Sequence, residues 1–247
     1  NLVGYTMVKL LHEAGVPVDV LQFVPGDGAT VGATLTADPR VAGVAFTGST
    51  ETARAINRAL ADRDAPIGIL IAETGGQNAM IADSSALPEQ LIKDVVTGAF
   101  GSAGQRCSAT RVLFIQRDVA DKVITMLAGA MQELKVGDPG LLSTDVGPVI
   151  DDDALAMLKT HAQRMDQEAK TIATVELDDG TANGTFFAPR AYEIDTLSRL
   201  EREVFGPVLH VIRYDANKLD AVIDAINATG YGLTLGVHSR IDETVER

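Results

Sequence analysis

The chain has 247 residues, of which 46% are hydrophobic, enough for one large domain or two smaller ones. Its formal net charge is −13 and no cluster of Lys and Arg offsets it, which excludes nucleic acid as a partner of this segment. The single cysteine cannot form an internal disulfide, and the sequence has neither a signal-peptide pattern nor a long apolar span, so we expect a cytoplasmic location and no membrane span.

Both ends of the sequence indicate an internal fragment. The chain does not begin with Met, and Asn1 leads directly into an amphipathic run, as though a helix were entered partway along. Residues 242–247 have the polar pattern of the opening of another helix. We therefore expect a piece of a longer protein, truncated at its C-terminal end.

Hydrophobic periodicity and turn residues predict alternating helices and strands in the first third of the chain. The predicted helices cover residues 2–14, 29–36 and 50–61, and the predicted strands cover residues 18–24, 41–46 and 67–72. Such alternation is typical of an α/β fold with a parallel sheet covered by helices.

The pattern restarts after residue 74, so we predict a domain boundary there, with domains at 1–73 and 74–247. The predicted helices of the second part cover residues 88–100, 119–134, 152–170 and 217–227, with Met126 and Met131 on a core face. The predicted strands cover residues 78–82, 112–116 and 233–238, together with a strand-rich stretch at 171–214. No internal repeat is visible.

Gly48 and Ser49 follow a predicted strand and precede a predicted helix. Backbone N–H groups at such a helix start favour an anion, and a glycine lets a phosphate approach closely, so a cofactor pyrophosphate could bind there. An ordinary helix cap explains the same residues at least as well. The G-x-G-x-x-G fingerprint is absent.

Cys107 is the only thiol of the chain and lies beside Arg106 in a loop of small residues. A lone cysteine is more often an inert core residue, but an accessible, electropositive loop favours the thiolate and therefore a nucleophile. Glu73 ends an apolar strand before Gly75 and Gly76, where a partly desolvated carboxylate can act as a general base. A solvated charge at a strand end is an equally good interpretation.

Glu203 and Phe205 stand two residues apart before a Gly-Pro turn. An acid and an aromatic ring so placed could hold a ribose and a nicotinamide, although anchoring of the loop alone explains them as well. The four histidines are scattered along the chain, with no metal-ligand spacing and no obvious carboxylate partner. Neither a metal site nor a Cys-His hydrolase is predicted.

Four of these motifs, taken together and in order, resemble the aldehyde dehydrogenase superfamily. They are residues 46–50 (FTGST), 73–76 (ETGG), 104–107 (GQRC) and 203–207 (EVFGP). Shorter matching segments lie at 25–28, 134–139, 147–148 and 231–233. The resemblance thus spans nearly the whole chain, and it implies part of a Rossmann-like NAD-binding domain at 1–73 and a three-layer α/β/α catalytic domain at 74–247.

The resemblance also implies roles for individual residues. Cys107 would be the nucleophile and Glu73 the general base, so that an aldehyde is oxidised to an acid through a thiohemiacetal and a thioester. The remaining residues, Gly75 among them, would contact the cofactor, NAD or NADP: Gly48 and Ser49 at the pyrophosphate, Glu203 at the nicotinamide ribose and Phe205 at the nicotinamide.

Residues 72–81 indicate which branch of the superfamily the chain resembles. Thr74 and Gln77 replace the Leu and Lys that most members of the superfamily carry, and residues 72–81 (AETGGQNAMI) are similar to the dehydrogenase module of bacterial bifunctional proline-utilisation flavoenzymes. That branch oxidises L-glutamate γ-semialdehyde, in equilibrium with 1-pyrroline-5-carboxylate, to glutamate. Ser108 would then help bind the α-carboxylate of the substrate, and FAD would belong only to an attached proline dehydrogenase domain outside this chain. The parent protein would be a homo-oligomer.

Two alternatives stay open from the sequence. The first is an aldehyde dehydrogenase for a different aldehyde. The second is a fragment that keeps the fold but does not turn over, in which Cys107 would react with a thiol label no faster than free cysteine and NAD would give no protection.

Overall fold

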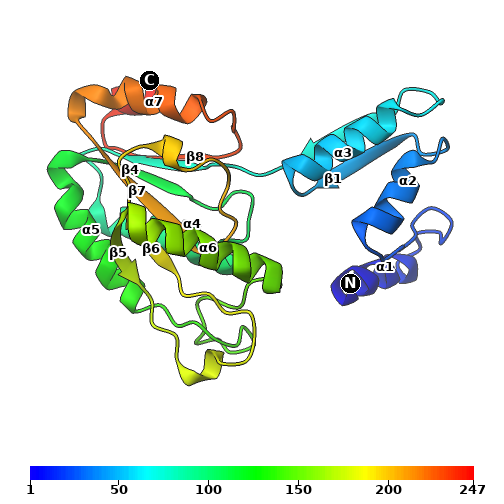
Figure 1. The fold of residues 1–247 in the computed structure, drawn as a ribbon, viewed down its shortest axis with the longest axis horizontal. Coiled ribbons are helices and arrows are strands. Elements are labelled where there is room, and N and C mark those ends of the chain that lie inside the picture. The colour runs from blue at the N-terminus through cyan, green and yellow to red at the C-terminus, as the bar shows by residue number, and fades with distance from the viewer. The chain divides into compact units, whose positions relative to one another are not determined.

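A computed structural model describes residues 1–247, and the chain forms two compact units, Asn1–Thr74 (unit 1) and Gly75–Arg247 (unit 2). Both units mix helices with parallel strands (Figure 1), which confirms the predicted α/β class. None of the helices combines the length and apolar character needed to cross a membrane.

Unit 1 is built around two parallel strands. Its elements are α1 (Leu2–Glu13), a π-helical turn η1 (Gly28–Gly32), α2 (Ala33–Ala37), β1 (Gly43–Thr47), α3 (Thr50–Ala61) and β2 (Ile69–Glu73). Thr47 pairs with Glu73 at the end of the β1–β2 ladder, so both strands finish at the same edge. The predicted helix at 50–61 matches α3, whose Ala53 and Leu60 are buried.

The strand predicted at residues 18–24 is wrong. Residues 18–20 form a turn in which Val20 N–H donates to the Pro17 carbonyl at 3.1 Å, and Val18 and Val20 are 68% and 73% exposed. A strand needs a neighbour for its backbone N–H and C=O groups, whereas β1 and β2 pair only with each other. The apolar residues at 18–24 predicted a buried strand, but no strand lies beside this segment to pair with it.

Unit 2 carries a six-stranded sheet with the order β5-β6-β7-β4-β3-β8, in which only the β5–β6 pair is antiparallel. The strands are β3 (Ala79–Ala82), β4 (Val112–Gln116), β5 (Lys170–Thr174), β6 (Arg190–Glu193), β7 (Val208–Tyr214) and β8 (Leu235–His238). The helices are α4 (Pro88–Phe100), α5 (Arg117–Gln132), α6 (Asp152–Glu168), α7 (Leu219–Asn227) and α8 (Asp242–Glu246). Short helical turns are η2 (Gly101–Gly104), η3 (Asp179–Thr181), η4 (Leu197–Arg199) and η5 (Ala216–Lys218).

The core of unit 2 lies between its sheet and its helices. Every residue of β3 and β4 is buried, as expected for central strands of a parallel sheet covered on both faces. α4 and α5 pack against each other and both contact β7. The largest aliphatic and Phe side chains that are almost fully buried come from five elements: Leu91 and Phe100 of α4, Leu113 and Ile115 of β4, Leu127 and Met131 of α5, Leu158 and Met165 of α6, and Leu209 of β7. The loops that join these elements are therefore attached to a closely packed base.

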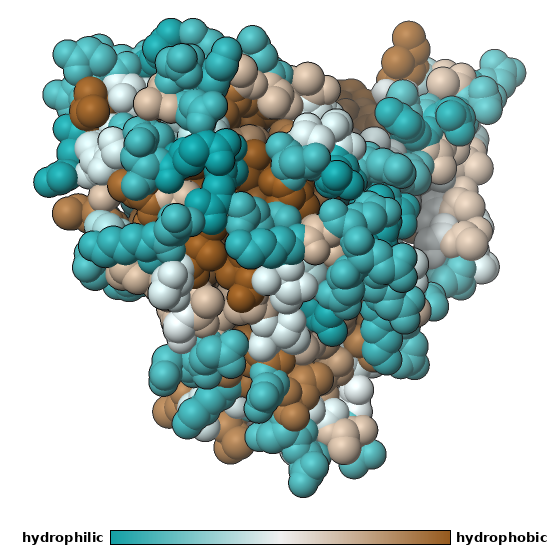
Figure 2. Space-filling view, turned by 60° about the vertical axis from the view of Figure 1, so that its left-hand side comes forward, coloured by the Kyte–Doolittle hydropathy of each residue, from teal (hydrophilic) through white to brown (hydrophobic).

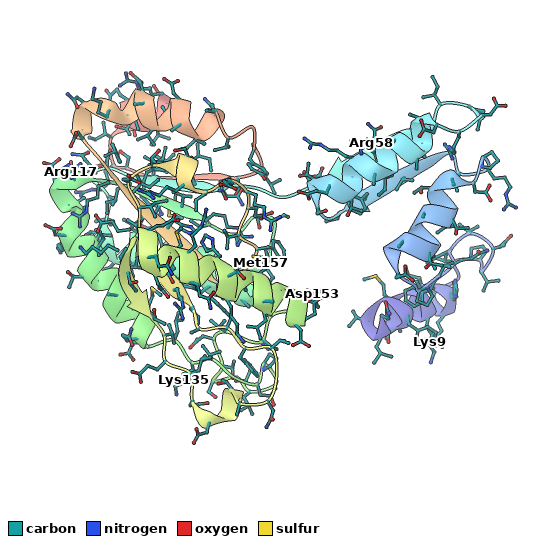
Figure 3. The ribbon with its side chains drawn as sticks, viewed as in Figure 1. Lys9, Arg58, Arg117, Lys135, Asp153 and Met157 are labelled. Atoms are coloured by element: carbon teal, nitrogen blue, oxygen red, sulfur yellow. The ribbon has the colours of Figure 1, made fainter.

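Charged side chains lie on the outside of both units, together with exposed apolar side chains such as Leu2 and Ile67. Figure 3 places Lys9 on α1 and Arg58 on α3, and both side chains are exposed. On the face shown in Figure 2, hydrophilic side chains predominate and hydrophobic residues show between them in patches. This surface agrees with the acidic, charge-rich composition of the sequence.

Candidate active site

The Thr47-Gly48-Ser49 loop joins β1 to α3 within unit 1. Ser49 is the N-cap of α3, and its hydroxyl accepts a hydrogen bond from Thr52 N–H at 3.1 Å. A β-carbon on Gly48 would lie 2.5 Å from the ring of Phe46, so the close packing of this loop requires glycine. The cap interpretation is thus correct.

Glu73 ends β2 beside this loop. Its carbonyl accepts a hydrogen bond from Gly48 N–H at 3.1 Å, which ties the two strand ends together. Its side chain is exposed, whereas the sequence predicted partial desolvation by the strand. The reason is that β2 belongs to a two-stranded sheet whose residues are mostly exposed, Ile71 among them. Unit 1 therefore brings Gly48, Ser49 and Glu73 to one edge.

Cys107 lies in a turn of unit 2 between η2 and β4, and its side chain is half-buried. The turn is held from below by Asn78, which is only 4% exposed. The Asn78 amide donates to the carbonyls of Cys107 at 2.6 Å and Ala109 at 2.9 Å, and its oxygen accepts from Thr234 N–H at 3.2 Å. Asn78 lies directly before β3, and Thr234 lies directly before β8. The Asn78 side chain thereby connects the backbone of Cys107 to two segments that are distant from it in the sequence.

The backbone just before Cys107 is strained. Ser102 and Ala103 have φ values of 54° and 55°, in the left-handed region that non-glycine residues rarely adopt, and Gly104 follows at 64°. A β-carbon on Gly104 would lie 2.1 Å from the Gly206 carbonyl oxygen. Strain of this kind is retained where the surroundings enforce it, which is common at functional sites.

Arg111 joins this turn to the loop that carries Glu203 and Phe205. It is 1% exposed, and its guanidinium forms an ion pair with Glu203 at 2.9 Å and lies 5.3 Å from the centroid of the Phe205 ring. Phe205 is itself 37% exposed, so part of this residue is accessible to a ligand. Burial lowers the pKa of Arg111, and the Glu203 hydrogen bond and charge, together with the charge of a Cys107 thiolate, oppose that shift.

Gly75 packs against Glu203 in the same unit. A β-carbon on Gly75 would lie 1.9 Å from the Glu203 Oε2 atom, so only glycine leaves this carboxylate in place. Ser108 is exposed next to the thiol, and its carbonyl accepts from the Thr234 hydroxyl at 3.4 Å. A cavity of about 280 Å³ adjoins Asn78 and Thr234. Unit 2 thus brings together Gly75, Cys107, Ser108, Glu203 and Phe205.

The sequence suggested that the four histidines are isolated, but two of them are in contact. The Nε2 atoms of His161 and His210 lie 2.9 Å apart, and His210 Nδ1 is 3.2 Å from the Arg111 carbonyl. Burial lowers the pKa of His161 to about 4, and burial with the nearby charge of His161 lowers that of His210 to about 3. A third, His238, lies 3.3 Å from the Asp94 carboxylate. The spacing of these residues in the sequence, 49 between His161 and His210, carries no sign of their contact.

Sequence reasoning also missed Arg111 and Asn78. Both act by contacts between residues far apart in the chain, such as Arg111 with Glu203, 92 positions away. One signal was available: Arg111 is a charged residue directly before the apolar run 112–115, which becomes a fully buried strand. A charge at such a place is seldom buried without a partner.

Comparison with known proteins places the chain in a family. The model of the aldehyde dehydrogenase family matches residues 1–247, and the chain belongs to that family. It is 53% identical, over 99% of its length, to the bifunctional protein PutA of Klebsiella aerogenes.

Two solved structures are similar to the chain over 99% of its length. A crystal structure of a bifunctional proline utilization A (PutA) protein is 57% identical with a TM-score of 0.95, and a 1-pyrroline-5-carboxylate dehydrogenase from Thermus with bound NAD is 33% identical with a TM-score of 0.91. The chain spans 19% of the length of the Klebsiella relative, 24% of that PutA structure and 48% of the Thermus enzyme.

Proposed function

We propose that the protein oxidises an aldehyde to a carboxylic acid with NAD as the hydride acceptor, and that the aldehyde is L-glutamate γ-semialdehyde, which becomes L-glutamate. The observation that carries the proposal is the thiol turn of unit 2. Its only cysteine is partly accessible, its backbone is fixed by Asn78, and Glu203 and Phe205 are joined to it through Arg111. The names of the similar proteins support the choice of substrate.

The two units have different tasks in this proposal. Unit 1, close to the predicted range 1–73, is the C-terminal part of the NAD-binding domain, and unit 2, close to 74–247, is the catalytic domain. Gly48 and Ser49 bind the pyrophosphate at the start of α3, where the helix dipole favours negative charge. Glu203 and Gly75 hold the ribose side, and Phe205 holds the nicotinamide side.

The residues present fit this cofactor. Glu203 Oε1 is bonded to Arg111, and its carboxylate remains partly exposed, as a ribose contact requires. Phe205 offers a partly accessible aromatic ring of the size and polarity that a pyridine ring prefers. NAD, when bound, accepts a hydride from the substrate carbon. NADP remains the comparison to test.

Cys107 begins the chemistry. Its thiolate attacks the aldehyde carbon and forms a C–S bond, while the carbonyl oxygen becomes an oxyanion to which the backbone N–H of Cys107 can donate. Loss of a hydride from that carbon converts the thiohemiacetal to a thioester. Glu73 then removes a proton from a water molecule, which attacks the thioester carbon and releases the acid and the Cys107 thiolate. Ser108 binds the α-carboxylate of the substrate.

Substrate profiling of the full-length protein that contains these residues tests the assignment. We expect NADH formation with L-glutamate γ-semialdehyde at a kcat/KM about a hundredfold above that with simple aliphatic aldehydes, because only the former has a carboxylate for Ser108. Preference for aliphatic aldehydes would instead support a dehydrogenase of different specificity. NADP in place of NAD in the same assay defines the cofactor.

Two variants separate the roles of the thiol and the carboxylate. Cys107→Ser should lower turnover by at least about a thousandfold and abolish alkylation by iodoacetamide at this position, which peptide mass spectrometry detects. Glu73→Gln should still give one equivalent of NADH in a rapid burst and then stall, because the thioester is no longer hydrolysed. An unreactive Cys107 in the native protein, unprotected by NAD, would mean that the protein keeps the fold without turnover.

The remaining proposals concern the protein as a whole. An attached proline dehydrogenase domain would bind FAD, which absorption spectroscopy of the purified full-length protein detects. We also propose a cytoplasmic homo-oligomer. Light scattering gives the mass of the assembly, and cell fractionation gives its compartment.

A further inference from the structure

Arg111 is the largest side chain of the protein that is almost fully buried, and it carries a charge into the base of the thiol turn. Its guanidinium has five N–H donors. Nη1 donates to the Gly104 carbonyl at 2.6 Å and to the Gly206 carbonyl at 3.3 Å. Nη2 donates to the Arg106 carbonyl and to Glu203 Oε1, both at 2.9 Å. Only Nε is buried without a partner.

These four bonds divide evenly between two loops. Gly104 and Arg106 belong to the segment that leads into Cys107, and Glu203 and Gly206 belong to the segment that ends at Pro207. Each Nη atom bonds one acceptor from each loop. The planar guanidinium therefore fixes the distance and the angle between the loops, which a flexible point charge cannot do.

The thiol turn needs such support. Ser102 and Ala103 adopt the left-handed conformation, which is unfavourable for residues that carry a β-carbon. The turn keeps this shape only if other contacts determine it. Arg111 supplies two of them, directly before and after Gln105, and so defines where the Cys107 sulfur is presented.

The second loop needs it for a different reason. Glu203 is partly exposed and is confined on one side by Gly75, so without a cation its carboxylate could rotate away from a ribose. The Arg111 ion pair holds Oε1 and leaves the rest of the carboxylate for the cofactor. The same guanidinium lies near the ring of Phe205 and limits its orientation.

We propose that Arg111 is a positioning residue that locks the thiol turn and the Glu203–Phe205 loop into one rigid unit, so that the nucleophile and the nicotinamide end of the cofactor are held in fixed register. This inference rests on the proposed function, because the placement of Cys107 relative to the nicotinamide matters only if the protein transfers a hydride to NAD. It adds a residue whose effect is transmitted through Cys107 and Glu203 and which itself touches no reacting atom.

The test compares Arg111→Met, Arg111→Lys and Glu203→Gln in the full-length protein, with Arg117→Met as the matched control. Arg117 is six residues along, and its ion pair with Asp215 is solvent-exposed, so its loss should change nothing measurable. Three quantities are measured: the rate of Cys107 alkylation by iodoacetamide, the KM for NAD, and kcat. Circular dichroism checks that each variant is folded.

Arg111→Met should slow alkylation about tenfold, raise the KM for NAD and lower kcat, because both loops lose their common anchor. Arg111→Lys should recover part of the alkylation rate but little of the KM, since an ammonium has only three donors on one atom and cannot bond both loops. Glu203→Gln should raise the KM for NAD and leave alkylation within about twofold of the native rate.

A folded Arg111→Met protein with native alkylation and native KM would overturn the proposal. If that variant does not fold, Arg111→Lys decides, and native values for both quantities would overturn it equally. Failure of the native protein to oxidise aldehydes would refute the proposed function instead. Alkylation is measured without substrate or cofactor, so the link between Arg111 and the thiol turn is tested in either case.

Discussion

Units 1 and 2 are both built from helices and parallel strands, but they hold their candidate site residues in different ways. In unit 2 the sheet has six strands, β4 is buried at every position, and Cys107 is fixed by side chains from distant segments. In unit 1 the sheet has two strands, and Ile67 and Ile69 on or beside β2 are 98% and 67% exposed. There Ser49 accepts from Thr52 N–H as the cap of α3, and Gly48 N–H donates to the carbonyl of Glu73 at the neighbouring strand end. The residues of unit 2 are thus held by a core, and those of unit 1 by local hydrogen bonds.

A pair of core substitutions tests this difference most strongly. Leu113→Ala, in the fully buried β4, should lower the free energy of unfolding of unit 2 by about 2–5 kcal/mol, because it leaves a cavity among tightly packed neighbours. Ile69→Ala, in β2, should lower that of unit 1 by less than about 1 kcal/mol. Urea denaturation followed by circular dichroism and by Cys107 accessibility measures both.

Equal losses for the two variants would break the comparison, because Ile69 would then be as well packed as Leu113. Since the substitutions remove branched aliphatic side chains of the same size from strands, each is the control for the other.

Local sequence patterns predicted the elements well and the contacts poorly. The helices at 50–61 and 88–100 and the strand at 112–116 agree with α3, α4 and β4 to the residue, because caps, Pro88 and apolar periodicity act within the segment itself. The strand at 18–24 failed because a strand is defined by its neighbour, which the segment does not contain.

The same distinction applies to the site. Cys107, Glu203 and Phe205 could be proposed from the sequence because short motifs carry them. The roles of Arg111 and of the His161–His210 pair could not be predicted, because they depend on contacts between residues far apart in the sequence. Arg111 and Glu203 are 92 positions apart, and the two histidines are 49 positions apart. The exposure of Glu73 was also missed, since burial of a strand end depends on the width of the sheet around it.

The His161–His210 pair makes unit 2 sensitive to acid. Both imidazoles are neutral in the folded state because burial lowers their pKa values, to about 4 for His161, whereas in the unfolded chain they take up protons below about pH 6.5. The unfolded state thus binds more protons, so stability falls as the pH falls from 6.5 toward 4, by up to about 1.4 kcal/mol per pH unit for each imidazole. Urea denaturation at several pH values measures this slope.

His161→Gln keeps a side-chain N–H donor for His210 but does not titrate, and it should flatten the slope between pH 6.5 and 4 relative to the native protein. His12→Gln is the control, because His12 lies in unit 1 and bonds only the Leu21 carbonyl, at 2.8 Å. An unchanged slope in His161→Gln would show that the pair takes up protons without unfolding.

The smallest expected effect concerns unit 1. Ser49→Ala removes the cap of α3 and should cost about 1 kcal/mol, and because the cap is local the loss should speed hydrogen exchange in α3 while the amides of β4 keep their native rates. Thr50→Ala, one residue along, leaves the cap intact and should change exchange in α3 far less. Should Ser49→Ala accelerate exchange in β4 as well, the Thr47-Gly48-Ser49 loop would be coupled to the core of unit 2, and the contrast between a locally held unit 1 and a core-held unit 2 would be wrong.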